Sequence, residues 1–108
     1  MNKTNTHKVI SSVDNSHLHD SGVEEAVLGA LMLEKDSVVV VSSVLGPDDF
    51  YRKSHSIIYQ AILQLDQDNQ PIDIKTVTHQ LRQTGKLDEV GGAAEVVAPI
   101  QGVNSAAN

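Results

Sequence analysis

The sequence predicts an all-α fold, a small bundle of about five short helices, on three observations. After about residue 20, apolar residues recur at spacings of three and four, which is the period of an amphipathic helix. Capping residues precede these segments, and glycine or proline follows several of them. The one β-branched run, Val38 to Val41, would have no second strand to pair with. The chain has 108 residues, 40% of them hydrophobic, so we expect one domain at most, with a modest aliphatic core.

Order is predicted to begin near residue 21. Residues 1–20 are rich in Asn, Ser, Thr and His and show no periodicity, so we expect a flexible polar tail. Ser21 and Glu24 match a capping box, in which Ser21 caps the helix and Glu24 bonds back to it, although Asp20 is an alternative cap. Residues 21–108 are then one helical head domain.

The first predicted helix carries a broad apolar stripe. Five residues at helical spacing form it: Val23, Ala26, Val27, Ala30 and Leu31. Three more widen it: Leu28, Met32 and Leu33. Gly29 stands inside this helix and costs about 1 kcal/mol relative to Ala. A close helix–helix contact at Gly29 would explain its presence.

The segment Val38–Leu45 is compatible with a strand or a helix. Its valines favour a strand, but Asp36 and Ser37 offer a helix cap, and Gly46-Pro47 provides a stop directly afterwards. We expect a helix.

All three aromatic residues of the chain lie close together, at Phe50, Tyr51 and Tyr59. We expect Phe50 to seal the junction between 38–45 and the next helix, because one buried ring adds a large apolar area to an aliphatic core. A base-stacking role for Phe50 would require a cationic groove. Tyr59 is expected to be half-buried, and Tyr51 is the best candidate for an exposed partner contact.

The third predicted helix runs from about residue 54 to 66. Its apolar side chains share one face: Ile57, Ile58, Ala61, Ile62 and Leu65. In the fourth predicted helix Asp73 is the N-cap, and Ile72 is placed to pack on Val77 as a hydrophobic staple. Gly85 supplies its left-handed C-terminal position, and Leu87 can fold back onto it.

The last predicted helix runs roughly from Val90 to Ala98 and stops before Pro99. Asn104 or Ser105 then looks like the cap of a further helix that the chain does not continue. We therefore interpret the chain as a fragment that ends at an element boundary.

Composition argues against several functions. The net charge is −6, and only Arg52 and Lys53 are adjacent basic residues, which disfavours direct binding to phosphates. The chain has no cysteine. Its first residues lack an apolar stretch and its apolar runs are only a few residues long, so we expect neither a signal peptide nor a membrane span. Its one Gly-Lys pair, Gly85-Lys86, lacks the glycine five residues earlier and the following Ser or Thr of a phosphate-binding loop.

No catalytic, cofactor-binding or metal-binding residue is predicted. His17 and His19 in the polar tail could chelate a metal only weakly, because nothing around them would orient the rings. His55, near the start of the third helix, is expected to make a structural hydrogen bond. The acidic pairs Glu24-Glu25, Asp48-Asp49 and Asp88-Glu89 are expected to complement helix dipoles.

Four motifs in order resemble the N-terminal domain of the bacterial replicative DNA helicase, the DnaB family. They are EEAVLGALMLEKDSV, LGPDDFYRKSHSIIYQAILQL, QPIDIKTVTHQLRQTGKLDEVGG and VNSAAN, and the resemblance covers about residues 23–108. Each motif alone is weakly specific, but their order and spacing are highly specific. The chain departs from the family at Glu25, where Gln is usual, and at Pro99, which interrupts the last helix.

The resemblance implies a non-catalytic domain that helps to form the collar of a hexameric ring, as a trimer of dimers, and that docks primase through the helicase-binding domain at the primase C-terminus. A helical hairpin, a linker and a RecA-like motor would follow in the whole protein. That motor, an ATP hydrolase, would use ATP and magnesium, whereas this region would use no cofactor. Single-stranded DNA would be contacted only through the full ring, without membrane contact, in the bacterial cytoplasm.

Two other classes remain open as alternatives: a small helix-turn-helix nucleic-acid reader and an independent metal- or hydrolase-type enzyme. The predicted structural anchors of the core are Val27, Leu31, Phe50, Ile58, Ile62, Leu65, Val77 and Leu81.

Overall fold

A computed structural model describes residues 21–34 and 36–107, with side chains for residues 22–34 and 36–101. This part of the chain is all-helical, which confirms the predicted fold class. Its elements are α2 (Ser21–Leu33), α3 (Ser37–Ser42), the 3-10 helix η1 (Pro47–Asp49), α4 (Lys53–Gln67), α5 (Ile74–Gln83), α6 (Leu87–Val90) and α7 (Ala93–Ala107). The short helix α6 was not anticipated. The predicted tail and its His17 and His19 lie outside the described residues.

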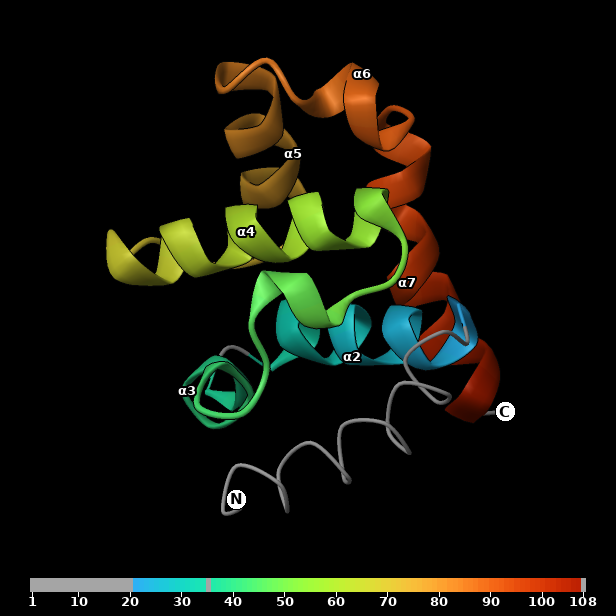
Figure 1. The fold of residues 1–108 in the computed structure, drawn as a ribbon. Coiled ribbons are helices and arrows are strands. Elements are labelled where there is room, and N and C mark those ends of the chain that lie inside the picture. The colour runs from blue at the N-terminus through green and yellow to red at the C-terminus, as the bar shows by residue number, and fades with distance from the viewer. Residues whose placement is uncertain (1–20, 35, 108) are drawn as a thin grey trace, which may run out of the picture.

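The helices form a layered bundle around α4 (Figure 1). α2 and α5 both pack against α4, and α7 runs down one side of the molecule. The most extensive contact between any two elements joins α2 to α7, so the first and last described helices lie together. Gly29 is buried in α2, as a close helix–helix contact there requires.

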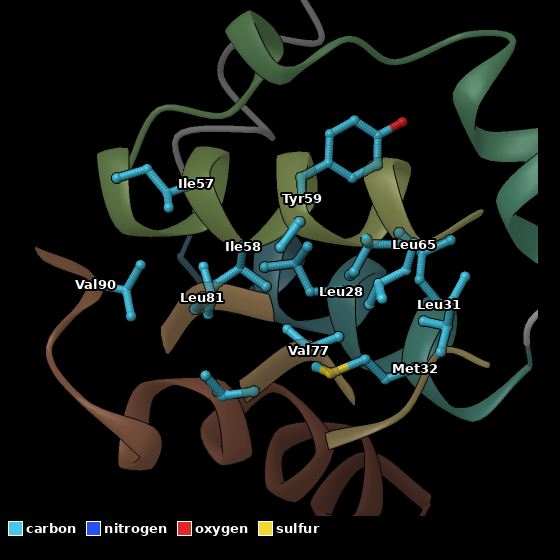
Figure 2. Packing of buried hydrophobic residues seen from close by; sticks show 14 of the residues in the cluster. Leu28, Leu31, Met32, Ile57, Ile58, Tyr59, Leu65, Val77, Leu81 and Val90 are labelled. Atoms are coloured by element: carbon cyan, nitrogen blue, oxygen red, sulfur yellow. The ribbon is translucent and has the colours of Figure 1, made fainter. Parts of the chain in front are cut away.

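The core is aliphatic with two aromatic rings. Figure 2 shows Leu28 of α2, Ile58 of α4 and Leu81 of α5 among the side chains that fill the space between the helices. Seven of the eight predicted anchors are at most 5% exposed: Leu31, Phe50, Ile58, Ile62, Leu65, Val77 and Leu81. The eighth, Val27, is only partly buried at the edge of the core.

The buried face of α2 differs from the predicted stripe. Val23 is 36% exposed, and Ala26 and Ala30 are exposed as well. The face turned to the core carries Leu31 of that stripe, Leu28 and Met32, which were expected to widen it, and Glu24, which was not expected there. Because α2 is apolar on nearly every side, its periodicity alone does not select one face. The buried position of a carboxylate was not detectable from this pattern.

α2 begins at Ser21, so Ser21 lies inside the helix and not at its predicted cap position, and the capping box does not describe Glu24. The fully buried carboxylate of Glu24 lies at the start of α4. Its most distant partner in the sequence, His55, is 31 residues away. Oε2 accepts the backbone N–H of Tyr51 at 2.5 Å, and Oε1 lies 3.4 Å from the backbone nitrogen of Arg52. Oε1 is also 2.6 Å from Nδ1 of His55. A carboxylate only accepts hydrogen bonds, so the ring hydrogen of His55 lies on Nδ1.

This contact serves as the N-terminal cap of α4. The N-cap residue, Arg52, makes no side-chain cap bond, and a guanidinium has no acceptor to offer. Glu24 supplies the missing oxygens from another helix, and its negative charge also suits the positive end of the α4 dipole. His55 therefore makes the structural hydrogen bond that was expected of it.

The segment after α2 is helical, as predicted, but α3 has only six residues. Asp36 occupies the N-cap position without a side-chain cap bond, and Ser37 Oγ bonds back to the carbonyl of Glu34 at 2.6 Å. Val38 is buried, whereas Val39 and Val40 are exposed. α3 thus contributes one valine fully to the core.

Tyr59 is fully buried, so the prediction of a half-buried ring was wrong. Its ring lies 4.9 Å from that of Phe50, centroid to centroid, and its hydroxyl donates to the carbonyl of Leu45 at 2.6 Å. That bond lets the polar end of the ring stay in the core. Burial raises the pKa of the Tyr59 phenol above its usual 10.0, and the nearby Asp49 carboxylate raises it further.

α5 begins and ends as its sequence predicts. Asp73 accepts the backbone N–H of Thr76 at 2.8 Å, and the Thr76 hydroxyl accepts the N–H of Asp73 at 2.9 Å. Gly85 has a φ of 73°, and the N–H of Lys86 bonds to the carbonyl of Leu81, which together form a Schellman stop.

The end of the chain corrects two predictions. Val90 closes α6 instead of opening the last helix, and α7 continues through Pro99 to Ala107. Asn104 is therefore inside a helix and does not start one. Pro99 has no N–H for the carbonyl of Glu95, but it is fully buried, and the packing of α7 on α2 outweighs the lost bond.

We predict that Glu24→Ala strongly destabilises the fold. It removes the carboxylate that accepts hydrogen bonds from the N–H of Tyr51 and from Nδ1 of His55. Removing one partner of a buried polar pair costs about 3–5 kcal/mol. Urea unfolding at neutral pH measures this free energy. Glu25→Ala, the same change at the neighbouring and less buried residue, should cost about 0.5 kcal/mol or less. Equal losses in the two variants would contradict the capping role of Glu24.

We predict that the effect of Tyr59→Phe on stability depends on pH. At pH 7 the loss of the bond to Leu45 should lower the free energy of unfolding by about 1 kcal/mol. The folded phenol keeps its proton to higher pH than the unfolded one, so wild-type stability falls as pH rises above about 10. The difference between the two proteins should therefore narrow above about pH 10. Because Tyr51 is present in both, its ionisation cancels to first order, and a constant difference would contradict the prediction.

Candidate protein-docking surfaces

The predicted partner contact, Tyr51, lies on the surface at the start of α4. Its side chain is 67% exposed, while its backbone N–H is held by Glu24 in the core. An exposed aromatic ring on an anchored backbone loses little freedom when a partner covers it, which favours Tyr at interfaces.

Charged residues surround this position. Arg52 Nη2 lies 3.7 Å from Oε1 of Glu95 on α7, and Lys53 Nζ lies 3.8 Å from Oε2 of Glu89 on α6. We call these four residues and Tyr51 the Tyr51 surface. The pairs are exposed, so each adds little stability, but they place both charge signs beside the ring.

A second exposed apolar region lies on and just after α3. Val39, Val40 and Val44 are 67%, 68% and 71% exposed. We call these three residues the α3 valine surface. The sequence prediction identified the helix here but not its exposure. A short helix has only one or two positions that face the core, and this segment has more valines than that. This excess of valines could have predicted that some of them are exposed.

A depression of about 1070 Å³ lies along α5 and the end of α4. Its lining includes the charged residues Asp68, Asp73, Lys75 and Arg82, together with His79. Both charge signs occur, and Asp73 is already engaged as the cap of α5. The lining therefore selects no particular ligand.

The described residues do not form a basic face. Arg52, Lys53 and Lys86 each lie within 4 Å of a glutamate carboxylate. The remaining described lysine and arginine, Lys75 and Arg82, are both on α5. Partly neutralised cations give weak attraction to phosphates, so this distribution does not favour nucleic-acid binding.

Among the described residues, no three His, Asp or Glu side chains are grouped so that they could hold a metal ion. His55 is 1% exposed and faces Glu24, and His79 is exposed on α5. Within the same ranges, no helix is long and apolar enough to cross a membrane.

Comparison with known proteins gives consistent matches. The family model of the DnaB-like helicase N-terminal domain matches residues 16–108. The chain is 46% identical over 85 residues to the replicative DNA helicase DnaC of Bacillus subtilis, covering 79% of this chain and 19% of that protein. It is 39% identical over 85 residues to the replicative DNA helicase DnaB of Geobacillus stearothermophilus, again covering 79% and 19%.

A solved structure is also similar. The N-terminal domain of DnaB helicase from Mycobacterium tuberculosis matches with a TM-score of 0.75 and 39% identity, covering 79% of this chain and 59% of that one. The family model thus matches most of this chain, whereas the chain spans about a fifth of the length of these two curated relatives. It belongs to the family of DnaB-like helicase N-terminal domains.

Proposed function

We propose that the chain is a non-catalytic assembly and protein-docking domain of a replicative DNA helicase. In this role it supports a hexameric collar and binds the C-terminal domain of primase. The observation that carries the proposal is the Tyr51 surface, an exposed aromatic side chain on a capped and rigid backbone, in a chain of this family.

The sequence features of the chain support a role without catalysis. Gly85, in the one Gly-Lys pair, has a φ of 73° and ends α5. A phosphate-binding loop needs such a glycine-rich turn to open a helix, so this pair does not supply one. ATP and magnesium would then act in the motor of the whole helicase, as would contact with single-stranded DNA.

The mechanism is geometric. Helices held by one continuous core keep their outer side chains in fixed relative positions, so a partner meets a preformed surface. Symmetric pairing of protomers would repeat this surface around the ring. A primase bound there would be held near the unwinding motor, which raises its effective concentration at newly exposed template.

Tyr51 is proposed as the anchor of the primase contact. Tyrosine is among the residues that contribute most to interface energies, because its ring buries a large area and its hydroxyl stays hydrated or bonded. The mixed charges of Arg52, Lys53, Glu89 and Glu95 would surround that anchor as a polar rim.

We predict that Tyr51→Ser weakens binding of the primase C-terminal domain to this chain by at least about tenfold, or 1.4 kcal/mol. Isothermal titration calorimetry with the purified primase domain measures the change. Tyr51→Phe keeps the ring and should keep most of the affinity. Circular dichroism of both variants checks that the helices are intact.

Two results would contradict the proposal. Undetectable binding of the unaltered chain to primase would remove the docking role of this region. Tight binding to duplex DNA that persists in moderate salt would instead support a nucleic-acid reader, in spite of the net charge of −6.

A further inference from the structure

The exposed valines after α2 are not explained by folding. Val38 is buried, and Val41 and Leu45 are partly buried against the core, so these three residues attach α3 to the bundle. Val39 and Val40, in the same helix, are largely exposed. β-branched residues are weaker helix formers than Ala or Lys, so exposed valines cost helix stability without adding core contacts.

These valines are also close together along the chain. Single exposed apolar residues are normal on protein surfaces, but clustered ones mark contact sites. Val39, Val40 and Val44 lie within six positions of each other, each about two-thirds exposed or more. Among large apolar side chains of the described residues, these and Tyr51 are the most exposed.

A groove continues the α3 valine surface. It has a volume of about 290 Å³ and lies between the start of α3 and the turn from α4 to α5. Val39, Pro71 and Ile72 supply apolar lining, and Asp36 and Asp66 supply carboxylates. None of the described lining residues is Lys, Arg or His. The described lining of the groove therefore combines apolar side chains with two carboxylates.

Charge decides which occupant fits. Between Leu33 and Phe50 the sequence has four acidic residues, Glu34, Asp36, Asp48 and Asp49, and one basic residue, Lys35. A second copy of this face would bring like charges together, which is unfavourable. Nucleic acid would be repelled for the same reason.

We propose that the α3 valine surface docks a cationic amphipathic helix of another protein, whose apolar side chains cover the valines. Lysine or arginine side chains of that helix would lay their aliphatic stems along Val39 and Pro71 and place their charges at Asp36 and Asp66. Six-residue α3 is only about 9 Å long, so the contact is small. Such small interfaces are typically transient and dissociate readily.

This surface is separate from the Tyr51 surface and adds a second partner to the proposed docking domain. Arg52 precedes α4 and Asp66 is near its end, so the Asp66 side of the groove lies about 20 Å from Arg52 at the helical rise of 1.5 Å per residue. A primase domain bound at Tyr51 and a helix bound at α3 could occupy the same head. This inference rests on the proposed role of the chain as a docking domain. It does not require that primase is the partner bound at the Tyr51 surface.

The test is an NMR titration of the 108-residue chain with a synthetic amphipathic helix of Leu and Lys. Shifted amide peaks are expected in α3, residues 44–46 and the groove, and the binding should weaken as salt is added. The same helix with Glu in place of Lys should not bind. Val40→Ser combined with Val44→Ser should weaken binding at least about tenfold.

Matched variants separate the contributions. Asp36→Asn with Asp66→Asn should weaken binding and flatten its salt dependence, because the cations lose their partners. Tyr51→Ser should leave peptide binding unchanged, although it weakens primase binding. Val40→Thr with Val44→Thr keeps the β-branched shape and serves if the serine pair unfolds α3.

Three outcomes would overturn the inference. Peak shifts centred on α5 or on Tyr51 would place the cationic helix elsewhere. Equal binding of the Glu helix, or no effect of the valine variants, would show that the surface does not select this chemistry. Weaker primase binding by the valine variants would make α3 part of the primase site, leaving the docking role intact but removing the second partner.

Discussion

The arrangement of this domain depends on one buried carboxylate. Glu24 reaches from α2 to the first residues of α4 and accepts hydrogen bonds that α4 cannot satisfy from its own cap position. A buried charge is costly unless it is fully bonded, so these contacts must form together. They fix where α4 starts and how its first turn faces α2. Apolar contacts in the rest of the core do not depend strongly on orientation. The hydrogen bonds of Glu24 do, so they fix the orientation of α4 relative to α2.

The same anchor connects the interior to the proposed docking surface. Immediately beyond the capped N–H groups, the side chains of Tyr51, Arg52 and Lys53 point to the outside, and the latter two reach glutamates of α7 and α6. Side chains from α2, α6 and α7 therefore all contact the start of α4. A substitution at Glu24 would therefore alter this surface, although the Glu24 side chain is itself fully buried.

Most of the fold was accessible from the sequence, because its signals are local. The cap at Asp73, the stop at Gly85 and the buried face of α4 each depend on a few neighbouring residues. Three features depend on distant ones. Glu24 matched a local capping pattern but bonds across 31 residues, Tyr59 is buried because Leu45 offers a carbonyl, and Pro99 is tolerated because α2 packs on α7. The exposure of Val39, Val40 and Val44 was not predicted. The sequence shows that these residues are apolar, but it does not show which apolar residues the core leaves exposed.

Pro99 has a consequence for how the domain folds. A helix interrupted by proline has little stability alone, since the residue before proline is disfavoured in helical geometry and one hydrogen bond is lost. α7 therefore gains its order from α2, at the opposite end of the described chain. Bringing such distant segments together carries the largest loop-closure entropy in the domain. We expect α4 and α5 to associate early and α7 to dock last, so that the head becomes complete in a single late step.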